Sequence, residues 1–266
     1  MNKIKQKLRE LFTIPKDYKI LFVNGHALNA SEIVINSYAH TQFIALGGNN
    51  PSALLLDEVA RSHGKSQKTS LKSVYMYQYE ELLSKLNTCS TKDKSRLKLV
   101  NSDVAFPYYD PLDCMVWVTS FDFLGAYGVS MIVVAPEIYN SPKILYKPRS
   151  AFNQFSLNSC LQEKSHPLIK VNKSALIALQ SKLSTFNLQE YRDDINYKRQ
   201  ILFDYFYENV RGEGIVFTID SGAIPEQVIK DWKCLESKHG VHLYLYEWSS
   251  MAYEQFIEDV QDAKSV

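Results

Sequence analysis

The sequence predicts an α/β protein with a mainly parallel sheet, followed by a smaller α+β lobe. Through the first half of the chain, short apolar runs of strand length alternate with segments of helical spacing. Many of these runs are rich in β-branched and aromatic residues, as expected for strands that helices cover on both faces. Beyond about residue 170 this alternation gives way to two long helical stretches. We therefore assign residues 1–170 to a large α/β domain and residues 171–266 to a small C-terminal lobe.

The first lobe begins with a helix that ends before Pro15, because proline disfavours helical geometry in the residue preceding it. Lys19–Asn24 is an apolar run of strand length, Gly25 ends it, and residues 29–39 return to helical spacing. Further strands are predicted at residues 41–46, 73–77, 97–100, 115–119 and 129–135, with a helix at 51–61. In a parallel sheet the carboxyl ends of the strands form the functional edge.

The second lobe is predicted from helical and strand patterns that follow one another without repeats. Its elements are helices at about 173–184 and 188–209, a strand at 214–219, a helix at 225–238, a strand at 241–246 and a helix from Met251.

The charge balance excludes broad classes of partner. The chain has 266 residues, with 30 Lys and Arg against 29 Asp and Glu, and a formal net charge of +1. Such a chain lacks the positive field that attracts nucleic acids or anionic membranes. Its longest apolar runs, such as Val129–Ala135, are less than half of the ~20 residues that span a bilayer. We expect no nucleic-acid partner, no membrane segment and, without a signal peptide, a cytoplasmic protein.

The four cysteines indicate neither a metal centre nor a disulfide framework. Cys89, Cys114, Cys160 and Cys234 stand far apart, with no CxxC spacing and no histidine at a metal-ligand interval. A chain of this length builds a sufficient core without disulfides. We expect no metal site.

Polar residues follow several of the predicted strands. A turn is predicted at Gly25, His26 and Ala27. It can present backbone N–H groups to a phosphate or carboxylate, or it can simply connect the strand to the helix. Histidine titrates near neutral pH, so His26 is a candidate acid or base, or else a surface histidine. Asn49 lies in a second glycine turn. Asp122 follows a third strand and is a candidate base, or a solvated or capping carboxylate.

In this order the segments resemble the class V branch of the fold-type I pyridoxal-phosphate (PLP) enzymes, and among these the phosphoserine aminotransferases. Residues 25–30 fall where the family has its glycine-rich phosphate turn, and residues 41–53 match the segment carrying its ring-stacking tryptophan. Residues 119–129 resemble the segment of the Schiff-base lysine, with Gly125 and Gly128 in register. The resemblance covers nearly the whole chain. It implies the mainly parallel, seven-stranded-type sheet of the PLP-dependent transferase (type I) fold.

The departures from the family concern the residues that handle the cofactor. Family chemistry needs a lysine for the Schiff base, an acid beside the pyridine nitrogen and an aromatic ring stacked on the cofactor. By the resemblance, these positions hold Asp122, Asn101 and Asn49, although a shift of two residues would offer Asp103 as the acid. No lysine occurs between Lys98 and Lys143 to replace the first of them. We expect a chain that uses no cofactor.

The sequence therefore predicts a degenerate aminotransferase-fold protein that binds or transforms a small polar anionic metabolite in the former cofactor cleft. The predicted catalytic residues are Asp122 and His26, and the predicted ligand-binding residues are Gly25, His26, Ala27, Asn49, Asn101 and Asp122. The family's clefts lie at subunit interfaces, which implies a homodimer. Two alternatives remain: a PLP-dependent aminotransferase with a relocated lysine, and a pseudoenzyme that acts through its surface as a regulatory or effector protein.

Overall fold

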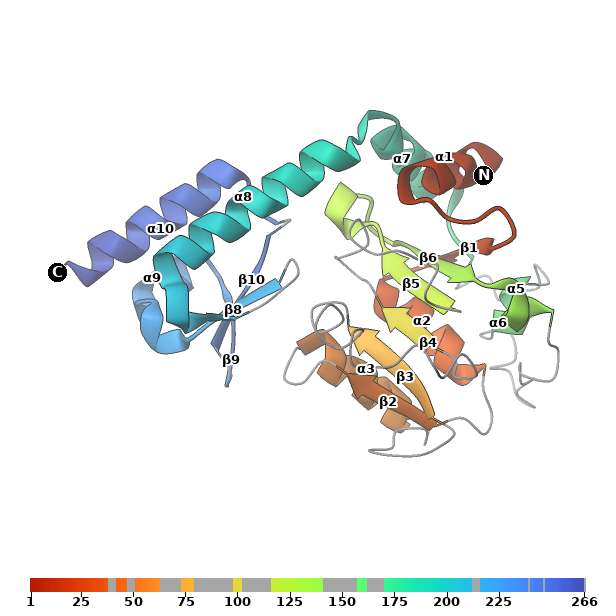
Figure 1. Ribbon diagram of the computed structural model, residues 1–266, viewed down its shortest axis with the longest axis horizontal. Coiled ribbons are helices and arrows are strands. Elements are labelled where there is room, and N and C mark those ends of the chain that lie inside the picture. The colour runs from red at the N-terminus through yellow and green to blue at the C-terminus, as the bar shows by residue number, and fades with distance from the viewer. Residues whose placement is uncertain are drawn as a thin grey trace. The chain divides into compact units, whose positions relative to one another are not determined.

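The computed structural model describes residues 1–37, 42–46, 51–62, 73–78, 98–101, 116–140, 157–161, 170–211, 216–238, 240–245 and 247–265 (Figure 1). The chain divides into two compact units, Met1–Phe186 and Asn187–Val266. Among the described residues, no helix is both long enough and apolar enough to cross a membrane.

The first unit is built on a sheet whose described strands follow the order β1-β6-β5-β4-β3-β2. The strands are β1 (Lys19–Asn24), β2 (Gln42–Leu46), β3 (Ser73–Gln78), β4 (Lys98–Asn101), β5 (Val116–Ser120) and β6 (Val129–Val134). Strands β2 to β5 pair in parallel, whereas β6 is antiparallel to both of its neighbours, β5 and β1. All the strands except β6 therefore run in one direction, which confirms the mainly parallel sheet.

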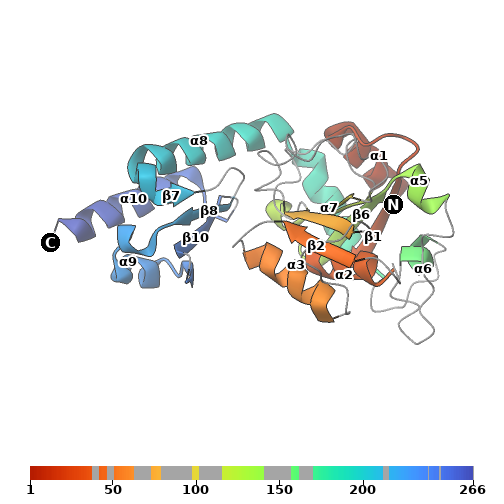
Figure 2. The same cartoon turned by 60° about the horizontal axis from the view of Figure 1, so that its bottom comes forward.

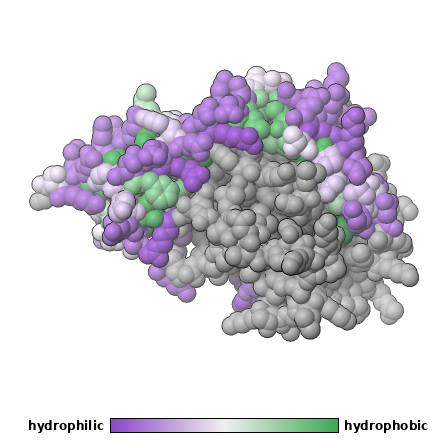
Figure 3. Space-filling model, viewed as in Figure 1, coloured by the Kyte–Doolittle hydropathy of each residue, from purple (hydrophilic) through white to green (hydrophobic). Residues whose placement is uncertain are grey.

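Helices pack on this sheet. They are α1 (Asn2–Phe12), α2 (Ala27–Asn36), α3 (Pro51–Ser62), α5 (Pro136–Tyr139), α6 (Leu157–Leu161) and α7 (Lys173–Thr185), with a 3-10 turn, η4 (Asp122–Leu124). In Figure 2, α2 and α3 lie below the strands and α1 lies above them. Every residue of β5 and β6 is buried, as expected for strands covered on both faces. Figure 3 shows an apolar patch where α7 lies.

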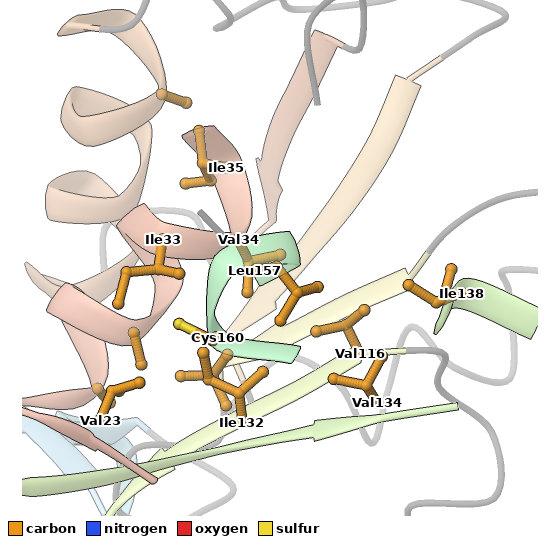
Figure 4. Close-up of a cluster of buried hydrophobic side chains, with 14 residues drawn as sticks. Val23, Ile33, Val34, Ile35, Val116, Ile132, Val134, Ile138, Leu157 and Cys160 are labelled. Atoms are coloured by element: carbon orange, nitrogen blue, oxygen red, sulfur yellow. The ribbon is translucent and has the colours of Figure 1, made fainter. Parts of the chain in front are cut away.

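An apolar core joins α2 to the strands on which it packs (Figure 4). Val34 of α2 is fully buried, and the cluster continues through Val116 and Ile132 to Leu157 and Cys160 of α6. Burial raises the pKa of the Cys160 thiol to about 11, so this cysteine remains a protonated, inert packing group at neutral pH.

The second unit is a small antiparallel sheet with helices. Its strands, in the order β7-β8-β10-β9, are β7 (Val210–Arg211), β8 (Val216–Ile219), β10 (Gly240–Tyr244) and β9 (Leu235–Ser237). Its helices are α8 (Leu188–Phe206), α9 (Glu226–Asp231) and α10 (Ser250–Lys264), with 3-10 turns η7 (Tyr207–Asn209) and η8 (Ser221–Ala223). Helix α7 belongs to the first unit, where Phe186 beyond its end contacts Phe12 and Phe123.

The helix predicted over residues 225–238 is too long. Helix α9 ends at Asp231, and β9 follows from Leu235. Lys233 adopts a left-handed backbone (φ 51°), and the Cys234 N–H donates to the Ile229 carbonyl at 3.0 Å, which turns the chain back. Trp232 packs in this turn against Trp248 and Phe256. Tertiary packing of one large side chain thus overrides the helical spacing.

Candidate functional site

Two strand ends meet beside β6. In the antiparallel register Asn24 of β1 pairs with Val129, and Ser120 of β5 pairs with Ser130. Both strands therefore end next to the first residues of β6, on opposite sides of it. Residues 25–26 follow β1 and residues 121–122 follow β5, so both pairs lie at the same carboxyl edge of the sheet.

The turn after β1 depends on its glycine. Gly25 adopts a φ of 100°, in the region that side chains rarely enter, and its N–H donates to the Gly128 carbonyl at 3.0 Å. A Cβ at this position would lie 2.7 Å from Oδ1 of Asn29. The same Oδ1 accepts a hydrogen bond from the His26 backbone N–H at 3.0 Å. Helix α2 thus begins directly after His26, whose backbone is held by the first turn of that helix.

The turn after β5 is held by aromatic packing. Phe121 is fully buried, and its N–H donates to the Val129 carbonyl at 3.3 Å. Phe123 makes an edge-to-face contact with Phe186, with ring centroids 5.9 Å apart. Asp122 lies between these two anchored phenylalanines, so its backbone position is fixed by buried contacts.

The two predicted catalytic residues contact each other through their side chains. Nε2 of His26 lies 2.9 Å from Oδ2 of Asp122, although the residues are nearly a hundred positions apart in the chain. The His26 side chain is 51% exposed and that of Asp122 is 12% exposed. A carboxylate at this distance from an imidazole nitrogen orients the ring. The pair therefore offers an oriented imidazole that solvent can reach, backed by a mostly buried carboxylate.

The other predicted ligand-binding residues are placed less completely. Ala27 is the first residue of α2 and fully buried in the core, so only its backbone faces the turn. Asn101 is the last residue of β4 and pairs in register with Val118 of β5, at the same edge of the sheet. Asn49 lies outside the described residues.

Metal coordination is not indicated in the part of the chain that the structure describes. No group of three or more His, Cys, Asp or Glu side chains is placed there to hold a metal ion.

The comparisons with known proteins identify the fold. No protein-family model and no curated protein matches the sequence. A phosphoserine aminotransferase from Bacillus circulans subsp. alkalophilus matches with a TM-score of 0.71 and 14% identity, over 99% of this chain and 86% of that one. A subgroup IV aspartate aminotransferase from Thermus thermophilus matches with a TM-score of 0.70 and 11% identity, over 97% of this chain and 89% of that one. The chain has the fold of these aminotransferases.

A PLP-bound phosphoserine aminotransferase from Trichomonas vaginalis matches as well, with a TM-score of 0.68 and 12% identity over 98% of this chain and 86% of that one. These matches confirm the predicted PLP-dependent transferase (type I) fold over nearly the whole chain. Sequence identities this low establish the fold alone. The chemistry must therefore be argued from the residues at the carboxyl edge of the sheet.

The residues at this edge do not fit a covalently held PLP. A Schiff base requires a primary amine, and the position that the resemblance assigns to the lysine carries the Asp122 carboxylate. That carboxylate contacts the His26 imidazole at 2.9 Å. The side chain present there can accept hydrogen bonds and hold a cation, but it cannot bond to an aldehyde carbon.

Proposed function

We propose that this chain is a degenerate aminotransferase-fold protein that binds or transforms a small polar anionic molecule at the carboxyl edge of its first sheet, without a covalent link to PLP. The observation that carries the proposal is the 2.9 Å contact between His26 and Asp122. The contact supports an acid–base pair at the position that the resemblance assigns to the Schiff-base lysine.

The preference for an anion follows from the groups at the turn after β1. Backbone N–H groups at the start of a helix attract negative charge, and helix α2 begins there with Ala27. The imidazole of His26 is a second donor when protonated. We propose that Asn49 and Asn101 add amide groups to the same pocket, in place of an aromatic ring and an acid.

Where the ligand is transformed, we propose proton transfer as the reaction. His26 takes a proton from the ligand at the ring nitrogen that does not contact Asp122. That nitrogen gives up the hydrogen bond that it accepts from the Asn29 backbone at the start of α2, and His26 later returns the proton while Asp122 holds the ring. This assigns His26 as the group that touches the ligand and Asp122 as the residue that orients it. No step requires an amine or a metal ion.

The first prediction concerns the cofactor. Incubation with PLP followed by borohydride reduction is expected to leave no stoichiometric pyridoxyl adduct, because the carboxylate of Asp122 has replaced the amine. Mass spectrometry of the intact protein and of its peptides measures this directly. A lysine modified at stoichiometric yield would establish the alternative, a PLP enzyme with a relocated lysine.

The second prediction concerns the contact between His26 and Asp122. His26→Ala is expected to weaken binding of inorganic phosphate, measured by titration calorimetry, because a donor is lost. Asp122→Ala is expected to strengthen it, because a nearby negative charge is removed, and both variants should change the melting temperature little. The pair is partly exposed, and such pairs contribute about 1 kcal/mol or less to stability. Asp57→Ala, which breaks the exposed ion pair with Arg61 on α3, is the matched control. If both site variants bind phosphate like the wild type, the edge of the sheet is not the ligand site, and the surface-acting pseudoenzyme becomes the better explanation.

A further inference from the structure

An anionic ligand beside His26 also lies close to the negative charge of Asp122. Asp122 is only 12% exposed, so water screens its charge incompletely, and it offsets much of the attraction that a protonated His26 provides. A site that prefers anions at this position needs a further positive charge. This need for a positive charge rests on the proposed function.

Helix α7 packs against the turn that carries Asp122. Leu179 and Leu183 are buried on one face of α7, and Phe186 beyond its end contacts Phe123 in η4. Helix α7 and η4 are in contact. The side of α7 next to its buried face, which carries Leu179 and Leu183, is therefore held in a fixed position beside the turn at η4.

Lys182 lies on that side of α7. Its Nζ is 3.8 Å from the point that a Cβ on Gly125 would occupy. Gly125 in turn donates its N–H to the Asp122 carbonyl at 2.8 Å, so it closes the turn that begins with Asp122. Within the described part of the chain, no hydrogen bond or ion pair engages the Lys182 ammonium. The absence of a side chain at Gly125 leaves the ammonium directly against the turn.

We propose that Lys182 is a ligand-binding residue that supplies the positive charge for an anionic group held over the turn from Asp122 to Gly125. A lysine ammonium is a compact charge on a flexible stem, which suits a carboxylate or a phosphate. With His26 as the proton-transferring group, the ligand class is a small molecule that carries one such anionic group near an exchangeable proton. Neutral analogues of the same size bind more weakly.

The test is a charge series at position 182, with inorganic phosphate as the probe and titration calorimetry as the measurement. Lys182→Gln is expected to weaken phosphate binding by roughly three- to ten-fold, the loss typical of one partly exposed charged contact. Lys182→Glu weakens it further, Lys182→Arg restores most of it, and the differences shrink as ionic strength rises. Acetate and sulfate, measured in parallel, distinguish a carboxylate-binding site from a phosphate-binding one.

Lys173→Gln is the matched control, because Lys173 is an exposed lysine at the other end of the same helix. If Lys173→Gln weakens binding as much as Lys182→Gln, the effect is one of overall charge and the assignment of Lys182 is wrong. If His26→Ala loses phosphate while Lys182→Glu retains it, the assignment is again wrong, but the proposed function stands. If the folded wild-type protein binds none of the three anions, the proposed function itself fails.

Discussion

Gly25 is the residue on which the placement of His26 depends most directly. Gly25→Ala is expected to destabilise the protein by roughly 1–3 kcal/mol, because alanine is strained at a φ of 100° and its Cβ would meet Asn29. Urea denaturation measures the change. Gly222→Ala is the control, since Gly222 lacks a positive φ and a Cβ there would have no atom within 4 Å. Equal stability of the two variants would show that the turn does not constrain the chain.

For individual residues, the sequence predicts which of them lie at strand ends but not which side chains are in contact. Gly25, His26 and Asp122 each follow an apolar run, and the rule for parallel sheets places them at one edge. Their direct contact depends on β6 lying between β1 and β5, which no local pattern reveals. Lys182 carries no motif at all. Its place beside Gly125 arises only from the packing of α7.

At the scale of elements, the start of α8 depends on a single side chain. Asn187 accepts hydrogen bonds from the backbone N–H groups of Gln189, at 3.0 Å, and Glu190, at 3.4 Å. Asn187→Ala removes this cap and is expected to cost about 0.5–2 kcal/mol of stability, measured by chemical denaturation. Asn187→Asp keeps an acceptor in place and should retain most of the stability. An unchanged midpoint for the alanine variant would contradict the role of the cap.

The elements differ in how far local pattern determined them. The range of β1 matches its apolar run residue for residue, because Gly25 and the polar residues before Lys19 limit it on both sides. Helix α9 shows the opposite case. Its helical spacing continues past Asp231, but the contacts of Trp232 with Trp248 and Phe256 end it. Such contacts come from distant parts of the chain, so a single sequence does not disclose them.

At the scale of the whole molecule, we predict a homodimer. The resemblance implies a cleft at a subunit interface, and the first unit carries exposed large apolar side chains at Tyr127 (75%) and Ile177 (59%). Burial of such side chains is a common source of stability in dimers. Light scattering at micromolar concentration should give twice the 30.6 kDa of one chain. A stable species of 30.6 kDa would refute the prediction.

The pairing of β1 has a kinetic consequence for the site. β1 lies at one end of the sheet formed by the described strands, and its described partner, β6, lies more than a hundred residues later in the chain. Pairing across such a separation is slow, because the entropy of closing a long loop is lost before any strand contact stabilises the pair. His26 therefore reaches Asp122 only after β5 and β6 have been synthesised and β1 has docked. Edge strands also open at lower free energy than central ones. Detachment of β1 alone would separate the pair while β2 to β6 stay paired with one another, so the integrity of the site depends on the docking of this strand.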